Sequence, residues 1–390
     1  MLEGIPPVPG RPGAPAPQPD PLHVREGLLA RNAGDVTQTF VELKTYVNTL
    51  KVFLSGLTTI TLRRSFQTYT DAERHAAIRA IATNTTLTSV NLSHNPGIDA
   101  VDAAELARNN TIINLSIDGA SVGDVGAAAL AQNTCIVDLN LNSNNISHVG
   151  AAALATNRTI SYLHLDHNRI GDAGATALTT SVTNYLYLCE NGITHVGVAQ
   201  LATNKKVKAL ILDGNAVGPE GITALAANTT IIHLSLKRNG IGNAAPAIDA
   251  LKAFARNTTC FFLNMDNNDI GDAGCAALSN SLGVAYLILS VNNITDAGAA
   301  ALAKLKQLNS LDLDGNNIGD QGILRICSIP HLALLSLAAQ QHMVTTDVGV
   351  AAIMNRRPRF RYLKLSSTTV ISNAALRDAL HNQYGAHVVD

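Results

Sequence analysis

The apolar residues of the chain recur in a fixed pattern over most of its length. With i as the first apolar residue of a unit, apolar side chains stand at i, i+3 and i+5, and Ile or Val follows at i+10; one copy is Ile160, Leu163, Leu165 and Ile170. Between i+2 and i+6 apolar and variable residues alternate, which is the period of a short strand with one buried face. Each unit is therefore predicted to begin with a β-strand.

The pattern defines thirteen units, whose first apolar residues are numbers 57, 87, 112, 136, 160, 183, 207, 231, 260, 284, 308, 332 and 360. Nine units carry Asn at i+8, where the chain leaves the strand: Asn95, Asn144, Asn168, Asn191, Asn215, Asn239, Asn268, Asn292 and Asn316. An Asn amide both donates and accepts hydrogen bonds. Stacked copies are therefore predicted to form a ladder that satisfies buried peptide groups of neighbouring units.

The second half of each unit carries helix signals. Ser, Thr or Gly stands at i+11, often before Asp or Pro, as at Gly171 and Thr295, and these residues favour a helix N-terminus. Gly at i+14 then opens an Ala-rich stretch, such as residues 150–155, whose small side chains should let neighbouring helices approach closely. The predicted helices end at Asn, which we interpret as a left-handed cap: Asn109, Asn133, Asn157, Asn204, Asn228 and Asn257.

A unit of one strand and one helix can bury its apolar face only by stacking on the next unit, so the chain is predicted to be an α/β solenoid. The repeated Leu-x-x-Leu-x-Leu-x-x-Asn-x-Ile motif, in register over residues 57–374, resembles the leucine-rich repeat family and its ribonuclease-inhibitor-like branch. The resemblance implies a horseshoe with parallel β-strands on the concave face and α-helices on the convex face. It implies partner binding more often than chemistry.

Two details narrow the resemblance. The segments 126–131, 150–155 and 298–303 are similar to the GALA-type repeats of secreted effectors of bacterial pathogens. The Asn-Thr-Thr sequences at Asn84, Asn228 and Asn257 are similar to repeats in effectors of intracellular bacteria. This likeness implies a bacterial protein that is translocated into the cytoplasm of a host cell.

The chain outside the repeats differs in composition. Eight of the thirteen prolines lie within residues 6–21, so residues 1–22 are predicted to be a disordered tail. Residues 23–56 show helical spacing and are predicted to cap the first repeat, and residues 375–390 to cap the last. The start lacks the basic and apolar regions of a secretory signal, and no run of about 18 apolar residues predicts a membrane span.

Composition and net charge limit which classes of protein this chain can belong to. Apolar residues make up 46% of the chain and charged residues 15%, which indicates a folded protein. A net charge of −1 argues against a whole surface built for nucleic acid or anionic membrane, so we expect neither nucleic-acid binding nor membrane insertion. Five Cys, an odd number, do not suggest a disulfide framework and favour a reducing compartment. The protein is expected to act as a monomer without a cofactor.

On each predicted strand, residues i+2, i+4 and i+6 should point away from the helices and form rows across the concave face. Aromatic residues make up only 4% of the chain, yet they gather in the middle of these rows. Exposed aromatic clusters beside charge are typical of protein-binding surfaces. The candidate binding residues in the first two rows are Tyr162, His164, Tyr185, Tyr187, Ile211, His233, Phe262 and Tyr286.

The third row is rich in acids and is expected to set the charge preference of the partner. Asp166, Asp213 and Asp266 are its candidate members. The predicted partner is a host protein with a basic or apolar convex surface. The opposing interpretation of the aromatic rows is that Tyr is a good strand former and only decorates the sheet.

Other chemistry is less well supported by the sequence. Asp166, His167, Cys189 and Glu190 are the strongest candidates for a zinc site, although adjacent side chains on a strand point apart. Motifs for a zinc protease, a phosphate-binding loop or a nucleophilic serine are not found in the sequence. The basic run from Arg356 to Lys364 could contact nucleic acid or an anionic lipid headgroup, but we interpret it as a solvated terminal strand.

We therefore predict a non-enzymatic protein–protein interaction scaffold. Three alternatives remain at this stage. Some GTPase-activating proteins use this repeat type, but they carry an acidic tail that this sequence lacks. A ubiquitin-ligase adaptor would need a box in residues 23–56, which lack the Leu-Pro opening of such a box. A zinc enzyme on the concave face is the third.

Overall fold

The computed structural model describes residue 54 and residues 56–340, 345–365 and 369–384. Strands and helices alternate through this part of the chain. The strands are β1 Thr59–Thr61, β2 Ser89–Asn91, β3 Asn114–Ser116, β4 Asp138–Asn140, β5 Tyr162–His164, β6 Tyr185–Tyr187, β7 Ala209–Ile211, β8 His233–Ser235, β9 Phe262–Asn264, β10 Tyr286–Ile288, β11 Ser310–Asp312, β12 Leu334–Leu337 and β13 Tyr362–Leu365. The helices are α4 Asp71–Ala82, α5 Ala100–Leu106, α6 Gly123–Leu130, α7 His148–Leu154, α8 Gly171–Leu178, α9 His195–Leu201, α10 Gly218–Ala226, α11 Ala245–Phe254, α12 Gly271–Leu278, α13 Asp296–Leu302, α14 Asp320–Ile326, α15 Asp347–Asn355 and α16 Ala374–Tyr384.

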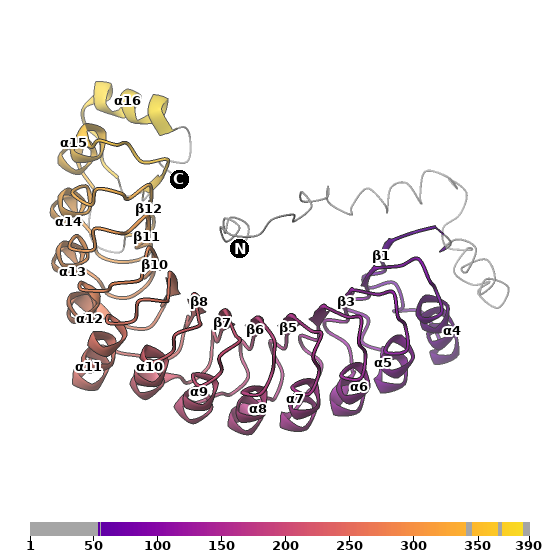
Figure 1. Cartoon of the computed structure of the whole chain (residues 1–390). Coiled ribbons are helices and arrows are strands. Elements are labelled where there is room, and N and C mark those ends of the chain that lie inside the picture. The colour runs from indigo at the N-terminus through magenta and orange to yellow at the C-terminus, as the bar shows by residue number, and fades with distance from the viewer. Residues whose placement is uncertain (1–53, 55, 341–344, 366–368, 385–390) are drawn as a thin grey trace.

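The strands form a single parallel sheet in which they follow one another in sequence order from β1 to β13. Figure 1 shows the resulting open arc, with the strands on its inner side and the helices on its outer side. The predicted horseshoe is thus confirmed. None of the helices in the described part of the chain has the length and apolar character to cross a bilayer.

Every strand begins two residues after the first apolar residue of its predicted unit, so the predicted register is correct from β1 to β13. The predicted strands were too long, because most are three residues and the chain turns soon afterwards. Residue i+7 has a positive φ in repeats along the whole solenoid, such as 55° at Ser143, 56° at His167 and 69° at Gly214. A left-handed residue cannot continue a strand, so the alternating pattern beyond i+4 lies in the turn.

The core lies between the sheet and the helices. Ile160, Leu163 and Leu165, at i, i+3 and i+5 of one unit, are at most 2% exposed, and the equivalent residues of the other units join them in one continuous cluster. Burying each such side chain stabilises the fold by roughly 1.5–3 kcal/mol. Because a strand of three residues has only its middle side chain in this core, the residues on either side of it face the inside of the arc.

The predicted asparagine ladder is present. Asn168 is 8% exposed, and its Nδ2 donates to the carbonyl oxygens of Leu141 and Leu165 at 3.0 and 2.9 Å. Its Oδ1 accepts from the backbone N–H of Asn144 and Ile146 in the preceding repeat, at 3.0 and 2.9 Å. One side chain therefore satisfies buried peptide groups in two repeats, and this bonding recurs from repeat to repeat along the arc.

The asparagines at the helix exits act differently from the prediction. None of the six has a positive φ, and the cap residue Ala131 before Asn133 is right-handed, so the predicted left-handed cap is wrong. Asn133 Oδ1 instead accepts from the N–H of Ile136 at 2.8 Å, and its Nδ2 donates to the carbonyls of Ala107 and Asn109. The exit asparagines thus form a second ladder, which joins the helix ends of successive repeats.

The small residues of the helices let neighbouring repeats approach as predicted. A Cβ added at Gly197 would lie 3.0 Å from the Cβ of Ala175 and 3.0 Å from the Cα of Asp172 in the preceding helix. Asp172 itself accepts from the backbone N–H of Thr194 and Gly197, at 2.8 and 3.0 Å. The close approach of the helices therefore also brings each acidic first turn onto the N-terminus of the next helix.

The predicted tail at residues 1–22 lies outside the described residues, as does the predicted cap at 23–56 apart from Leu54 and Gly56. At the other end, α16 follows the last strand and buries Leu380. Residues 385–390 of the predicted C-terminal cap lie outside the described residues.

Candidate protein-binding site

The predicted binding residues lie on six consecutive strands, β5 to β10. Tyr162, Tyr185, His233, Phe262 and Tyr286 are first residues of their strands, and all are half-buried. His164, Tyr187 and Ile211 are last residues of their strands and are also half-buried. The middle residues between them are buried in the core, so these eight side chains stand on the inner face of the arc.

The structure brings the first four into one cluster, which we call the first aromatic block: Tyr162, His164, Tyr185 and Tyr187. Tyr162 and Tyr185 pair across β5 and β6, and their rings stack with centroids 4.3 Å apart. His164 and Tyr187 pair in the same register and stack at 4.1 Å. His164 Nε2 also lies 3.4 Å from a carboxylate oxygen of Asp138 on β4.

A second aromatic block lies on β8 to β10 and comprises His233, Phe262, Tyr286 and Phe261. His233 and Phe262 stack with centroids 4.0 Å apart. Phe261 is 44% exposed and its ring lies 5.0 Å from that of Tyr286. The sequence interpretation missed Phe261, because it counted only i+2, i+4 and i+6 as outward positions. An aromatic residue directly before the strand of a chain so poor in aromatics was the available signal.

Strand β7 separates the two blocks. Ala209, which stands between Tyr185 and His233 in the register of the sheet, is only 4% exposed and carries no ring. Ile211 lies beside Tyr187 on the same strand pair. Parallel strands are about 4.8 Å apart, so roughly 10 Å lie between the facing edges of the blocks at β6 and β8. The inner face therefore offers two aromatic platforms with a shallow aliphatic surface between them.

Burial changes the titration of two block residues. Burial lowers the pKa of His233 to about 4, so this imidazole is neutral at physiological pH. Burial, followed by the charge of Asp138, raises the pKa of the Tyr187 phenol. Both rings are therefore uncharged donors or acceptors, which suits contacts with a largely apolar partner.

The three predicted acids lie two residues beyond the ends of β5, β7 and β9, in the turns, and form hydrogen bonds or ion pairs within the fold. Asp166 Oδ1 accepts from the backbone N–H of Cys189 at 2.7 Å, and Asp213 Oδ1 accepts from the hydroxyl of Ser235 at 2.6 Å. Burial raises the pKa of both carboxyl groups. Asp266 is paired with Lys237 at 2.6 Å. The acidic row is thus partly neutralised by its own neighbours.

The zinc candidates do not gather into a site. Among the described residues, a group of three possible ligands within 4.8 Å occurs only at His75, Asp99 and Asp102, on α4 and the start of α5. There the buried Arg74 bonds Asp102 at 2.8 Å, which supplies the positive charge that the carboxylate requires. Burial, with the charge of Asp166 next, raises the pKa of the Cys189 thiol, which opposes its ligation as a thiolate.

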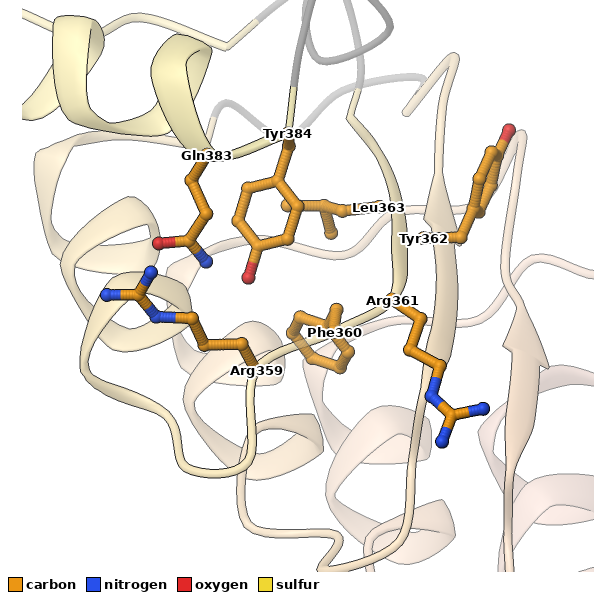
Figure 2. Close-up of a pocket in the computed structure, with 7 residues that line it drawn as sticks. All are labelled: Arg359, Phe360, Arg361, Tyr362, Leu363, Gln383 and Tyr384. Carbon is orange, nitrogen blue, oxygen red and sulfur yellow. The ribbon is translucent and has the colours of Figure 1, made fainter.

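A cavity of about 420 Å³ lies at the C-terminal end, between β13 and α16. Figure 2 shows the Tyr384 ring between Gln383 and Leu363, with Phe360 below it. Arg356, in the basic run, is 5% exposed, donates to the carbonyl of Ile329 at 2.7 Å and stacks on Phe360. We assign this region to the closing of the last repeat, because strands β11 and β12 separate it from the second aromatic block.

Comparison with known proteins agrees with this architecture. The family model of the Leucine Rich repeat matches seven segments of the chain, residues 83–107, 132–155, 156–178, 203–226, 262–279, 285–303 and 305–327. A search of curated proteins found no match.

Several solved structures are similar. An internalin, inlF, from Listeria monocytogenes aligns over 83% of this chain and 89% of its own, with 21% identity and a TM-score of 0.52. The ectodomain of the receptor kinase GASSHO1/SCHENGEN3 from Arabidopsis thaliana, in complex with CASPARIAN STRIP INTEGRITY FACTOR 2, has 18% identity over 74% of this chain and 38% of its own, with a TM-score of 0.43. The plant peptide hormone receptor RGFR1, in complex with RGF2, has 12% identity over 69% of this chain and 49% of its own, with a TM-score of 0.34.

The internalin shares the fold with this chain, and the seven matched segments fall on the same strand–turn–helix units that the sheet register defines. The chain is a leucine-rich repeat protein, and so belongs to a class of scaffolds that typically mediate protein–protein interactions.

Proposed function

We propose that this chain is a bacterial effector that acts in the host cytoplasm, as a monomer and without enzymatic activity, by holding a host protein on its concave face. The two aromatic blocks are the observation that carries the proposal. Half-buried aromatic side chains on an inner surface provide large contact areas of the kind that dominates binding energy at protein interfaces.

The stacked geometry supports this proposal. A free aromatic side chain loses rotamer freedom when a partner covers it, and this loss weakens binding. The rings of Tyr162 and Tyr185 already hold each other at 4.3 Å, and those of His233 and Phe262 at 4.0 Å. These rings are largely fixed before a partner arrives, so less binding energy is lost on complex formation.

The preferred partner has a convex, apolar surface with basic residues at its margin. The arc of the solenoid suits a convex element, and the blocks suit apolar contacts (Figure 1). Asp138 lies beside the first block, where its side chain is 42% exposed, and Asp166 and Asp213 lie in the turns after β5 and β7. Asp266 is already paired with Lys237, so we place the basic contacts near the first block.

The bacterial and host assignments rest on similarity. The Gly-Ala-rich helices and Asn-Thr-Thr turns are similar to repeats of bacterial effectors, and the internalin with the same fold comes from Listeria monocytogenes. Translocation into a host cell is the remaining part of the proposal and is tested separately, by a reporter fusion in infected cells.

The binding proposal is tested by affinity capture from host lysate with three forms of the protein. The wild type should retain a partner that the Tyr185→Ala, Tyr286→Ala double variant loses, with Kd raised at least about tenfold for the purified partner. Tyr362→Ala is the matched control, because Tyr362 stands in the same row on β13, outside both blocks. Equal retention by all three forms would remove the concave blocks from the interaction.

A further inference from the structure

The two edges of the solenoid differ in charge. All strands are parallel, so every connection from a helix to the next strand lies on the same edge. From α4–β2 to α15–β13, all within the described residues, the twelve connections of this edge contain no Asp or Glu. They contain twelve cationic residues: Arg108, Arg158, Lys205, Lys206, Lys208, Arg256, Lys304, Lys306, Arg356, Arg357, Arg359 and Arg361.

These cations recur with a period of two repeats. They lie in the connections α5–β3, α7–β5, α9–β7, α11–β9, α13–β11 and α15–β13, and the six connections between these carry neither Lys nor Arg. Except for the buried Arg356, all of them are exposed. We call these eleven exposed side chains the basic rim. The connections that carry them are spread along the solenoid from α5 to β13.

The opposite edge is net acidic, although it also carries Arg63, Arg64, Arg169, Lys237 and Arg238. The connections from strand to helix hold Asp118, Asp166, Glu190, Asp213 and Asp314, among others, and the first helical turns add Asp124, Asp172 and Asp272. The opposite charges of the two edges therefore largely cancel in the net charge of −1. On the acidic edge Asp124, Asp172 and Asp272 accept hydrogen bonds from the next repeat, which gives those acids a structural role.

The basic rim has little comparable role in the fold. Lys205, Lys206 and Lys208 are exposed, and within the described part of the chain no carboxylate lies within ion-pair distance of them. Arg108 pairs with Glu105 of its own helix at 3.1 Å, and Arg158, Lys306 and Arg357 donate to backbone carbonyls. Neighbouring cations without acidic partners repel one another, and this repulsion destabilises the folded protein. Binding to an external anionic surface would reduce the repulsion.

Apolar side chains stand among these cations. Leu282 is 65% exposed and occupies the repeat position that Arg158 and Lys205 occupy in other units, two residues before i. Ile113, at the position of Lys208, is 43% exposed. Cations mixed with exposed Leu and Ile are typical of surfaces that lie in a membrane interface.

We propose that the basic rim adsorbs the solenoid edge-on to an anionic lipid bilayer. Lys and Arg side chains would contact the headgroups, and Leu282 and Ile113 would reach the acyl boundary. A bilayer fits better than nucleic acid, because phosphate contacts alone would leave Leu282 without a role, and the rim carries no row of aromatic residues for stacking bases. Edge-on adsorption leaves the concave face open for a protein.

The test is flotation of the full chain with vesicles of phosphatidylcholine alone or with 30% phosphatidylserine. We expect binding only to the anionic vesicles, lost between about 0.1 and 0.5 M salt because the ions screen the rim. The Lys205→Glu, Lys206→Glu, Lys208→Glu variant should partition at least about tenfold more weakly. Leu282→Ser should also weaken binding to the anionic vesicles, and this loss should not depend on the salt concentration.

The matched control is Arg64→Glu, Arg169→Glu, Arg238→Glu, which changes the net charge equally on the opposite edge. It should float like the wild type. Equal loss in both variants would overturn the proposal, because it would indicate attraction by net charge alone. Binding of a single-stranded oligonucleotide together with no binding to anionic vesicles would also overturn it, and would assign the rim to nucleic acid. These assays are independent of any partner on the concave face.

Discussion

Tyr162 and Tyr185 stack face to face across neighbouring strands, with ring centroids 4.3 Å apart and ring planes 8° apart. The pair exists because the sheet places the same repeat position of β5 and β6 directly opposite each other. In a parallel sheet with a fixed register, equivalent side chains of successive repeats stand about 4.8 Å apart. Any two aromatic residues at such positions are therefore brought close to stacking distance, so the repeat itself builds the platform.

This relationship predicts a measurable coupling between the two rings. In a double-mutant cycle of Tyr162→Ala and Tyr185→Ala, the free energy of unfolding should reveal a coupling of about 0.5–1.5 kcal/mol, the range found for aromatic pairs. Tyr185 and Tyr286, four strands apart on β6 and β10, serve as the uncoupled pair. Additive losses for Tyr162 and Tyr185 would show that the rings merely lie side by side without stabilising each other.

A second prediction concerns the asparagine ladder. Asn191→Leu should lower the free energy of unfolding by about 1–3 kcal/mol, because unpaired buried peptide groups are costly. The side chain donates to the carbonyls of Leu165 and Cys189, both at 2.9 Å, and accepts from the N–H of Ile170 at 3.2 Å. Urea denaturation measures the loss, and Asn110→Leu, at an exposed Asn, is the control. A loss no larger than that of the control would mean that water replaces the side chain.

The sequence predicts features that are set by the residue spacing within one repeat better than contacts that form between repeats. The spacing of Ile160, Leu163 and Leu165 recurs in each unit, so strand register and ladder positions were predictable. The role of Asn133 was not, because Asn after a helix is also a common left-handed cap, and its bonds to Ala107 and Asn109 form only when the repeats stack. Phe261 was missed for a similar reason, since its contact with Tyr286 exists only between stacked repeats.

A third prediction tests the close approach of the helices. Gly197→Ala should destabilise the protein by about 1–3 kcal/mol, the usual cost of overpacking. The added methyl group would lie 2.6 Å from Asp172 Oδ1 and 3.0 Å from the Cα of Asp172, which is backbone and cannot move aside. Gln200→Ala on the exposed side of the same helix is the control, and thermal unfolding compares the two. An unchanged midpoint for Gly197→Ala would mean that the helices can separate at little cost.

A fourth prediction follows from the pKa of His233, which burial lowers from its ordinary value of 6.5 to about 4. Between these values the unfolded chain binds a proton that the folded protein does not, so the free energy of unfolding should fall as the pH falls from 6.5 to 4. The fall attributable to this residue is at most about 3 kcal/mol. His233→Gln should remove it, and the difference between wild type and variant, measured by urea denaturation at several pH values, cancels the titration of the aspartates. A difference that stays constant over this pH range would show that the imidazole is open to solvent and is not held under the ring of Phe262.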